Sequence, residues 1–168
     1  KGHSTYPNNS AGGIAARKVS FDRPYGRGQS TTALPGVGAG HFLTHDSEYN
    51  NGAAGWEYSM VRWLEHAGYD VTYQTDVDTH DALPTGRYRG ILIVGHDEYW
   101  SVAMQSHVRA AQAAGASVGV FGANTAYWNV RFEPSTVGAN RVIAAYKDEH
   151  GADPLEGTLD ESWLFTGN

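Results

Sequence analysis

Cysteine is absent from the 168 residues of this sequence. Its absence excludes disulfide bonds, zinc thiolate centres, iron–sulfur clusters and any cysteine nucleophile. Charged residues are also sparse, at 18%, and 18 acidic residues outweigh 12 basic ones to give a formal net charge of −6. A negative surplus disfavours binding to nucleic acid or to an anionic membrane, because both need a basic face. No apolar run approaches the roughly 18 residues of a membrane span.

The residues that are abundant indicate one folded domain. The length of 168 residues fits a single domain over residues 1–168, with a Gly-, Ser- and Asn-rich segment over residues 1–17 that we expect to be irregular. Hydrophobic residues make up 40% of the chain, with 5 Trp and 10 Tyr, which argues against disorder. The first residues lack the apolar stretch of a signal peptide. Cytoplasmic and secreted locations both remain open.

Hydrophobic periodicity predicts alternating helices and strands through the middle of the chain. Apolar residues recur at helical spacing from Trp56 to Ala67, and Gly68 follows where a C-terminal cap is expected. A continuous apolar run at 91–94 is typical of a strand buried on both faces. The alternating order of helices and strands predicts an α/β domain with a mainly parallel sheet. We predict strands at 18–21, 69–73, 91–94, 117–121 and 142–146, and helices at 56–67, 75–83 and 101–114.

Polar side chains follow the two most apolar predicted strands. Ligands of open parallel sheets bind beyond the carboxyl ends of the strands, so these positions are candidates for chemistry. The candidate residues form three groups. The first group directly follows the strand at 91–94, the second follows the strand at 117–121, and the third opens the first helix. They are His96, Asp97, Glu98, Tyr99 and Trp100; Asn124, Tyr127 and Trp128; and Glu57 and Tyr58.

Each of these candidates also has a structural explanation. Trp100 and Trp128 are expected to pack in the core. Asp97 or Glu98 could simply cap the helix that Ser101 opens, and Tyr58 could be a surface tyrosine.

Other motifs have simpler explanations. The Gly-x-Ser-x-Gly pattern at 115–119 places its serine at the start of a strand, whereas a nucleophile elbow needs a strand before the serine and a helix after it. The Gly-rich segment 36–40 follows no strand and is interpreted as a connector. His41 and His45 have metal-ligand spacing only if they lie on a helix, which the surrounding glycines disfavour. Helix capping and a solvated face explain Asp76, Asp78, His80 and Asp81.

Several longer strings resemble the N,N-dimethylformamidase large-subunit family. The resemblance covers most of residues 18–148 and rests chiefly on His-Asp-Glu-Tyr-Trp-Ser at 96–101 and Phe-Gly-Ala-Asn at 121–124. It implies a domain similar to class I glutamine amidotransferases, which is a flavodoxin-like three-layer α/β sandwich. It also implies that the chain is part of a longer protein that works with other domains or subunits. The remaining matching strings lie at 19–25, 62–65, 68–71, 75–78 and 146–148.

The same resemblance implies an iron-dependent amidohydrolase. Its mononuclear Fe3+ would be held by two tyrosines and a glutamate, for which Tyr99 and Tyr58 are the matching tyrosines. Phenolate and carboxylate oxygens suit a hard trivalent cation, which can polarise an amide carbonyl and activate water. His96, Asp97 or Glu98 would move protons, and Asn124 would orient the carbonyl. The glutamate has no clear match: Glu133, Glu156, Glu161 or a residue beyond Asn168 are the candidates.

Two classes of function without catalysis remain open beside cleavage of a small linear amide. An amidotransferase-like module of a larger protein could bind a small molecule or a carbohydrate, since Trp and Tyr side chains stack well on sugars. A purely structural domain that assembles with other chains is the third interpretation. Iron content would distinguish the enzyme from both.

Overall fold

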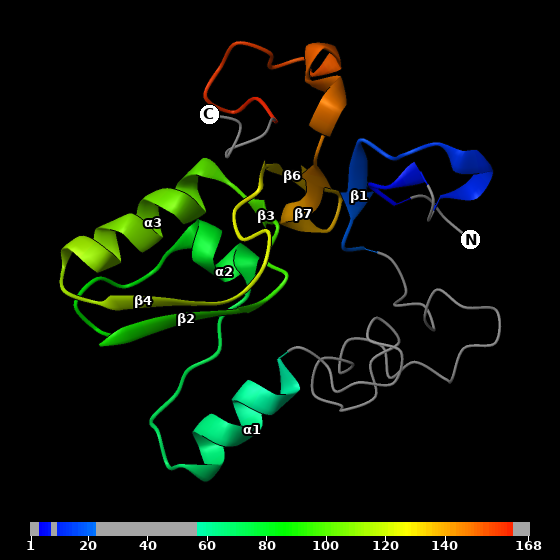
Figure 1. The fold of residues 1–168 in the computed structure, drawn as a ribbon. Helices are drawn as coiled ribbons and strands as arrows, with labels where there is room; N and C mark the ends of the chain where they lie inside the picture. Colours follow the sequence, from blue (N-terminus) through cyan, green and yellow to red (C-terminus); the bar gives the residue numbers. More distant parts are fainter. Residues whose placement is uncertain (1–3, 8–9, 23–56, 163–168) are drawn as a thin grey trace, which may run out of the picture.

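The computed structural model describes residues 4–7, 10–22 and 57–162 (Figure 1). Within these ranges the chain forms a mixed α/β structure with small parallel and antiparallel sheets. Strands β2 (Gly90–Gly95) and β4 (Ser117–Gly122) pair in parallel, as do the short strands β3 (Tyr99–Trp100) and β5 (Trp128–Asn129). The antiparallel sheet has the order β1-β7-β6, from Lys18–Ser20, Gly138–Ala144 and Arg131–Ser135.

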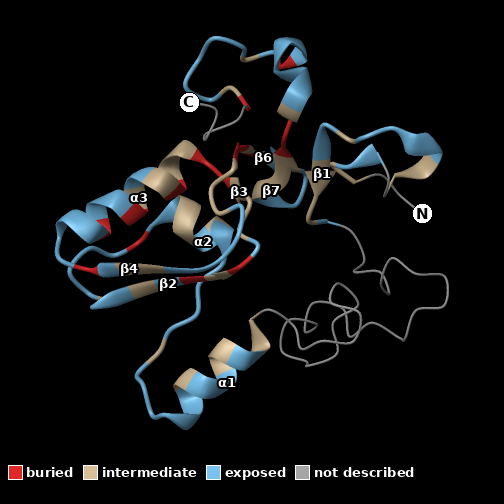
Figure 2. Cartoon of the chain, in the orientation of Figure 1, coloured by how far each residue is buried: buried red, intermediate tan, exposed pale blue. Residues whose placement is uncertain are grey.

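The β2–α3–β4 unit consists of two parallel strands connected by a helix. Helix α3 (Val102–Ala113) connects the two parallel strands, and the Ser101 hydroxyl caps it by accepting a hydrogen bond from the backbone of Met104. Gly115 follows the helix with a φ of 101°, a conformation that favours glycine. The helix and both strands predicted for this stretch are therefore confirmed, but the strands are not buried on both faces, since Leu92 is 43% exposed and Phe121 is 54% exposed (Figure 2).

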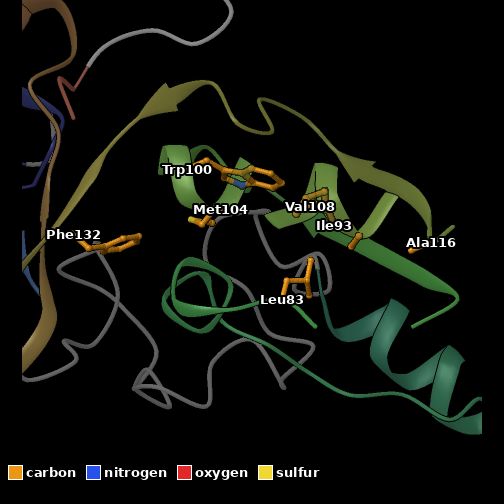
Figure 3. Packing of buried hydrophobic residues seen from close by; sticks show 8 residues of the cluster. Leu83, Ile93, Trp100, Met104, Val108, Ala116 and Phe132 are labelled. Atoms are coloured by element: carbon orange, nitrogen blue, oxygen red, sulfur yellow. The ribbon is translucent and has the colours of Figure 1, made fainter. Parts of the chain in front are cut away.

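A hydrophobic core fills the space between α3, the parallel strands and the antiparallel sheet. Met104 of α3 is 1% exposed and lies among apolar side chains from β2, α3 and β6. Phe132 of β6 joins this cluster, so one core supports both types of sheet (Figure 3). As expected from the sequence, Trp100 and Trp128 are buried. The buried cluster comprises Leu83, Ile93, Trp100, Met104, Val108, Ala111, Ala116 and Phe132.

The antiparallel sheet differs from the predicted mainly parallel arrangement. The predicted strand at 18–21 is confirmed as β1, in which Val19 lies opposite Ile143 of β7. The strand predicted at 142–146 starts earlier and pairs with β6 in a hairpin, where Ser135 lies opposite Gly138. Strands joined by so short a connection can pair only antiparallel, because a parallel crossover needs a dozen or more residues.

The prediction of a strand at 69–73 is wrong. The structure leaves this segment without regular structure between α1 (Tyr58–His66) and α2 (Asp76–Asp81), although both predicted helices are confirmed. Its aromatic side chains contact α1 instead: the Tyr73 hydroxyl donates to Glu65 at 2.8 Å, and the ring of Tyr69 lies 5.5 Å from that of Trp63. Without this strand beside β2, the described residues do not form a flavodoxin-like three-layer sandwich.

Candidate functional site

The segment from His96 to Trp100 sends its side chains into three different surroundings. His96 and Asp97 line a cavity next to β2, Trp100 lies in the hydrophobic core, and Glu98 and Tyr99 face residues 5–6 of the N-terminal segment. Backbone hydrogen bonds to the segment that leads into β5 fix this arrangement: the amide of Trp128 donates to the carbonyl of Glu98 at 2.9 Å. A sequence-predicted cluster is thus divided between two sites.

The cavity beside β2 has a volume of about 600 Å³. Its walls are mainly apolar and come from β2, α3 and α1, with Ile93, Met104 and Leu64 as examples. Part of its polar lining lies at the carboxyl end of β2 and the first turn of α2, where Asp76 and Asp97 meet. This is the edge of a parallel pair at which a ligand is expected.

Asp76 and Asp97 form a carboxyl pair that shares a hydrogen bond. Crowding by surrounding protein, and then the negative charge and hydrogen bond of Asp97, raise the pKa of Asp76 to about 7, although its side chain remains open to solvent on the cavity side. Burial also raises the pKa of Asp97. A pKa near 7 leaves the pair partly protonated at neutral pH, and one proton shared by two carboxyl groups is the state that can donate and accept protons in one reaction.

Capping does not explain Asp76, although it does explain Asp78. Asp78 completes a capping box with Thr75, as the sequence predicts. His80 contacts the Ser101 hydroxyl at 2.8 Å, and Asp81 accepts a hydrogen bond from Asn140 at 2.7 Å. Sequence reasoning missed the role of Asp76, because no local pattern shows that the start of α2 lies against the end of β2.

Glu98 lies in a different, donor-rich environment. Its Oε1 accepts hydrogen bonds from the Tyr6 hydroxyl at 2.5 Å and from the indole Nε1 of Trp128 at 2.9 Å. Beside it, the Tyr99 and Thr5 hydroxyls are 3.1 Å apart. The capping role considered for Asp97 and Glu98 is not observed, because Ser101 itself caps α3.

The ammonium of Lys147 lies among three aromatic rings. Its Nζ lies 3.3 Å from the ring centroid of Tyr6, 4.9 Å from that of Tyr99 and 5.5 Å from that of Trp128. The Nζ is buried and makes no hydrogen bond with the described part of the chain. Burial lowers the pKa of Lys147 to about 8, against the opposing influence of Glu98 and Asp148. Sequence reasoning assigned it no function, although it lies within the family-like string at 146–148.

The two predicted iron ligands lie in separate elements. Tyr58 is the first residue of α1 and its hydroxyl accepts a hydrogen bond from Arg62 at 3.1 Å, whereas Tyr99 lies on β3. Figure 1 draws α1 well apart from β3. Burial raises the pKa of Tyr99, which opposes the phenolate form that a ferric ion needs. The described arrangement therefore does not fit a two-tyrosine iron centre, and the iron site stays a prediction from the resemblance.

The remaining predicted site residues are dispersed. Glu133 pairs with Lys18 at 2.6 Å, and Glu161 lies 3.3 Å from His150 Nδ1, so both candidates for a third ligand already have charged or polar partners. Glu156 is exposed. Asn124 lies in the turn after β4 with a φ of 57°.

Two further features are absent from the described residues. No group of three or more His, Asp or Glu side chains there is arranged to hold a metal. His41, His45 and the segment 36–40 lie outside the described residues. No helix in the described part of the chain is long and apolar enough to cross a membrane.

Comparison with known proteins identifies a family. No curated protein matches this chain. The family model described as "N,N-dimethylformamidase beta subunit-like, C-terminal" matches residues 1–166, which is nearly the whole sequence. The match agrees with the resemblance seen in the motifs at 96–101 and 121–124, and it carries no information about a glutamine amidotransferase-like part. The chain therefore belongs to the N,N-dimethylformamidase beta subunit-like family.

Proposed function

We propose that this domain takes part in the hydrolysis of a small linear amide, with the substrate held in the cavity beside β2. The observation that carries the proposal is the Asp76–Asp97 pair at the polar end of that cavity. The N,N-dimethylformamidase-like family supports an amidohydrolase role. The mainly apolar walls suit a ligand with few polar groups, whose amide would lie toward the two carboxyl groups.

The carboxyl pair supplies both proton transfers that amide hydrolysis needs. The ionised member of the pair accepts a proton from a water molecule as the oxygen of that water bonds to the carbonyl carbon. The protonated member donates its proton to the nitrogen as the C–N bond breaks. One water is consumed, and a carboxylic acid and an amine are released. His96, which also lines the cavity, is placed to contact the same substrate. Glu98 and Asn124 are not among the cavity-lining residues.

Three finer expectations from the resemblance remain part of this proposal. Ferric iron held by Tyr58, Tyr99 and a glutamate remains a prediction of the resemblance, and no step of the proposed hydrolysis depends on it. The β2–α3–β4 unit supports a flavodoxin-like layer, since a helix that connects parallel strands is its repeating element. The family description, which refers to a beta subunit, supports action within a larger assembly.

The proposal is tested by measuring amine release from a panel of small amides. We expect Asp76→Asn and Asp97→Asn each to lower kcat at least about 100-fold, because each removes one proton transfer. Asp81→Asn is the matched control, since it removes an exposed carboxylate from the same helix. Wild-type turnover by both Asp76→Asn and Asp97→Asn would contradict the assignment of the pair.

A non-catalytic binding module is the second candidate function. It is favoured by exposed aromatic rings on and after α1, where Trp63 is 54% exposed and Tyr69 is 57% exposed. Such rings offer faces for stacking on a carbohydrate. Binding in a glycan screen that is lost in Trp63→Ala, together with no turnover of any amide, would support this role instead.

A further inference from the structure

Three rings from distant parts of the chain surround one ammonium group. We call Tyr6, Tyr99 and Trp128 the aromatic cage. They come from the N-terminal segment, β3 and β5, and the pairing of β3 with β5 places Tyr99 opposite Trp128. The Nζ of Lys147 lies within 5.5 Å of all three ring centroids. These distances are within the range at which a cation is attracted to the face of an aromatic ring.

A carboxylate completes the cage. Glu98 is held by hydrogen bonds from two of the cage side chains, Tyr6 and Trp128, so it is fixed relative to the rings. Its charge acts on the ammonium of Lys147. Electron-rich ring faces beside an anchored carboxylate are the groups that recognise alkylated ammonium ions.

Lys147 is a poorly matched occupant of this cage. A lysine ammonium is compact, strongly hydrated and carries three N–H donors, yet this Nζ is buried without a hydrogen bond to any described residue. Burying donors without partners costs free energy. The backbone of Lys147 also has a φ of 50°, a left-handed conformation that residues other than glycine adopt at a cost.

A methylated ammonium ion would avoid the cost of the unpaired donors. A quaternary ammonium has no N–H donors to leave unpaired, and its methyl groups pack against ring faces. Tyr6 remains 41% exposed, so the cage reaches the surface on the side of the N-terminal segment. Truncation of lysine to alanine removes as many non-hydrogen atoms as a trimethylammonium group contains, so the vacated space matches such a group in size.

We propose that the aromatic cage with Glu98 is a binding site for small methylated ammonium cations, which displace Lys147 from it. The proposal is independent of amide hydrolysis, because the cage residues do not line the cavity beside β2.

The test compares choline with 3,3-dimethylbutan-1-ol, its uncharged isostere. Binding is followed by NMR through the indole N–H of Trp128, which lies in the cage, and by calorimetry. We expect Lys147→Ala to bind choline at least about tenfold more tightly than the wild type does, and at least about tenfold more tightly than it binds the isostere. Lys147→Met is the matched control, because an uncharged chain of similar length keeps the cage filled and should prevent binding.

Equal binding of choline and its isostere by folded Lys147→Ala, or binding of neither, would overturn the proposal. If Lys147→Ala shows no cooperative thermal unfolding, the wild-type protein decides. Choline must then shift the Trp128 indole signal at a concentration at least several-fold lower than the isostere does. Shifts at equal concentrations, or no shift with either compound, would reject the cage as an ammonium site.

Discussion

Asp97 and Glu98 are neighbours in the sequence but lie in opposite environments. Asp97 lines the cavity and meets another acid, Asp76, and the pKa of each carboxyl group is raised. Glu98 meets two hydrogen-bond donors, Tyr6 and Trp128, which both donate to its Oε1. The comparison shows that one short acidic string can supply a proton-exchanging group to one site and a fixed hydrogen-bond acceptor to another.

Iron binding would contradict the separation of the two environments most completely. It would need Tyr99, which lies beside Glu98, and Tyr58, which lies on α1, to meet at one metal ion. We expect Tyr99→Phe to abolish any iron binding, because the variant loses the phenol oxygen that would ligate the metal. The measurements are elemental analysis of iron-loaded protein and the tyrosinate-to-iron absorption band. Tyr127→Phe is a suitable control, as it removes a phenol oxygen that is not predicted to bind metal. Stoichiometric iron retained by Tyr99→Phe would exclude this tyrosine as a ligand.

Removal of each carboxylate should affect stability differently. Glu98→Ala leaves the buried indole N–H of Trp128 without its acceptor, so we expect a loss of about 1–3 kcal/mol in the free energy of unfolding. Asp97→Asn keeps a hydrogen-bond acceptor and removes a repulsive charge, so we expect a change of less than about 1 kcal/mol. Urea denaturation of both variants measures the difference. Equal losses would show that the two environments are energetically alike.

The smallest predicted effect is a dependence of stability on pH. The pKa of Asp76 is raised from 3.8 to about 7, so the folded protein binds this proton more tightly than the unfolded chain does. The stabilisation is therefore complete below the unfolded pKa and is lost as pH rises toward 7. Because Asp76 is open to solvent, we expect a decrease of only about 1 kcal/mol from pH 5 to pH 8. Urea titrations at the two pH values measure the decrease in the free energy of unfolding, and Asp76→Asn should remove the part of this decrease that comes from Asp76. An unchanged decrease would assign the pH dependence to other groups.

The features that the sequence predicted correctly are those that depend on neighbouring residues. The helix from 102 to 113 follows from its Ser101 cap and the glycine after its end, and the strands on either side follow from continuous apolar runs. The segment 69–73 shows the limit of such patterns. Its alternation is that of a strand, yet a strand also needs a partner, and its tyrosines contact α1 instead.

The candidate sites were only partly predictable for the same reason. The string at 96–100 indicated chemistry at the end of β2, and the structure places two of its residues, His96 and Asp97, at the cavity there. Lys147 and Tyr6 lie 141 positions apart along the chain, and nothing in either local sequence shows that they meet.

By itself, the sequence determined the family, the helix and strand positions around the core and the acidic string after β2, because these depend on residue identity and short-range spacing. Only the tertiary structure decided that Asp97 faces Asp76 while Glu98 faces Tyr6, Trp128 and Lys147. Proton sharing and cation binding depend on distances of a few ångströms between groups that are remote in sequence, and folding alone sets those distances.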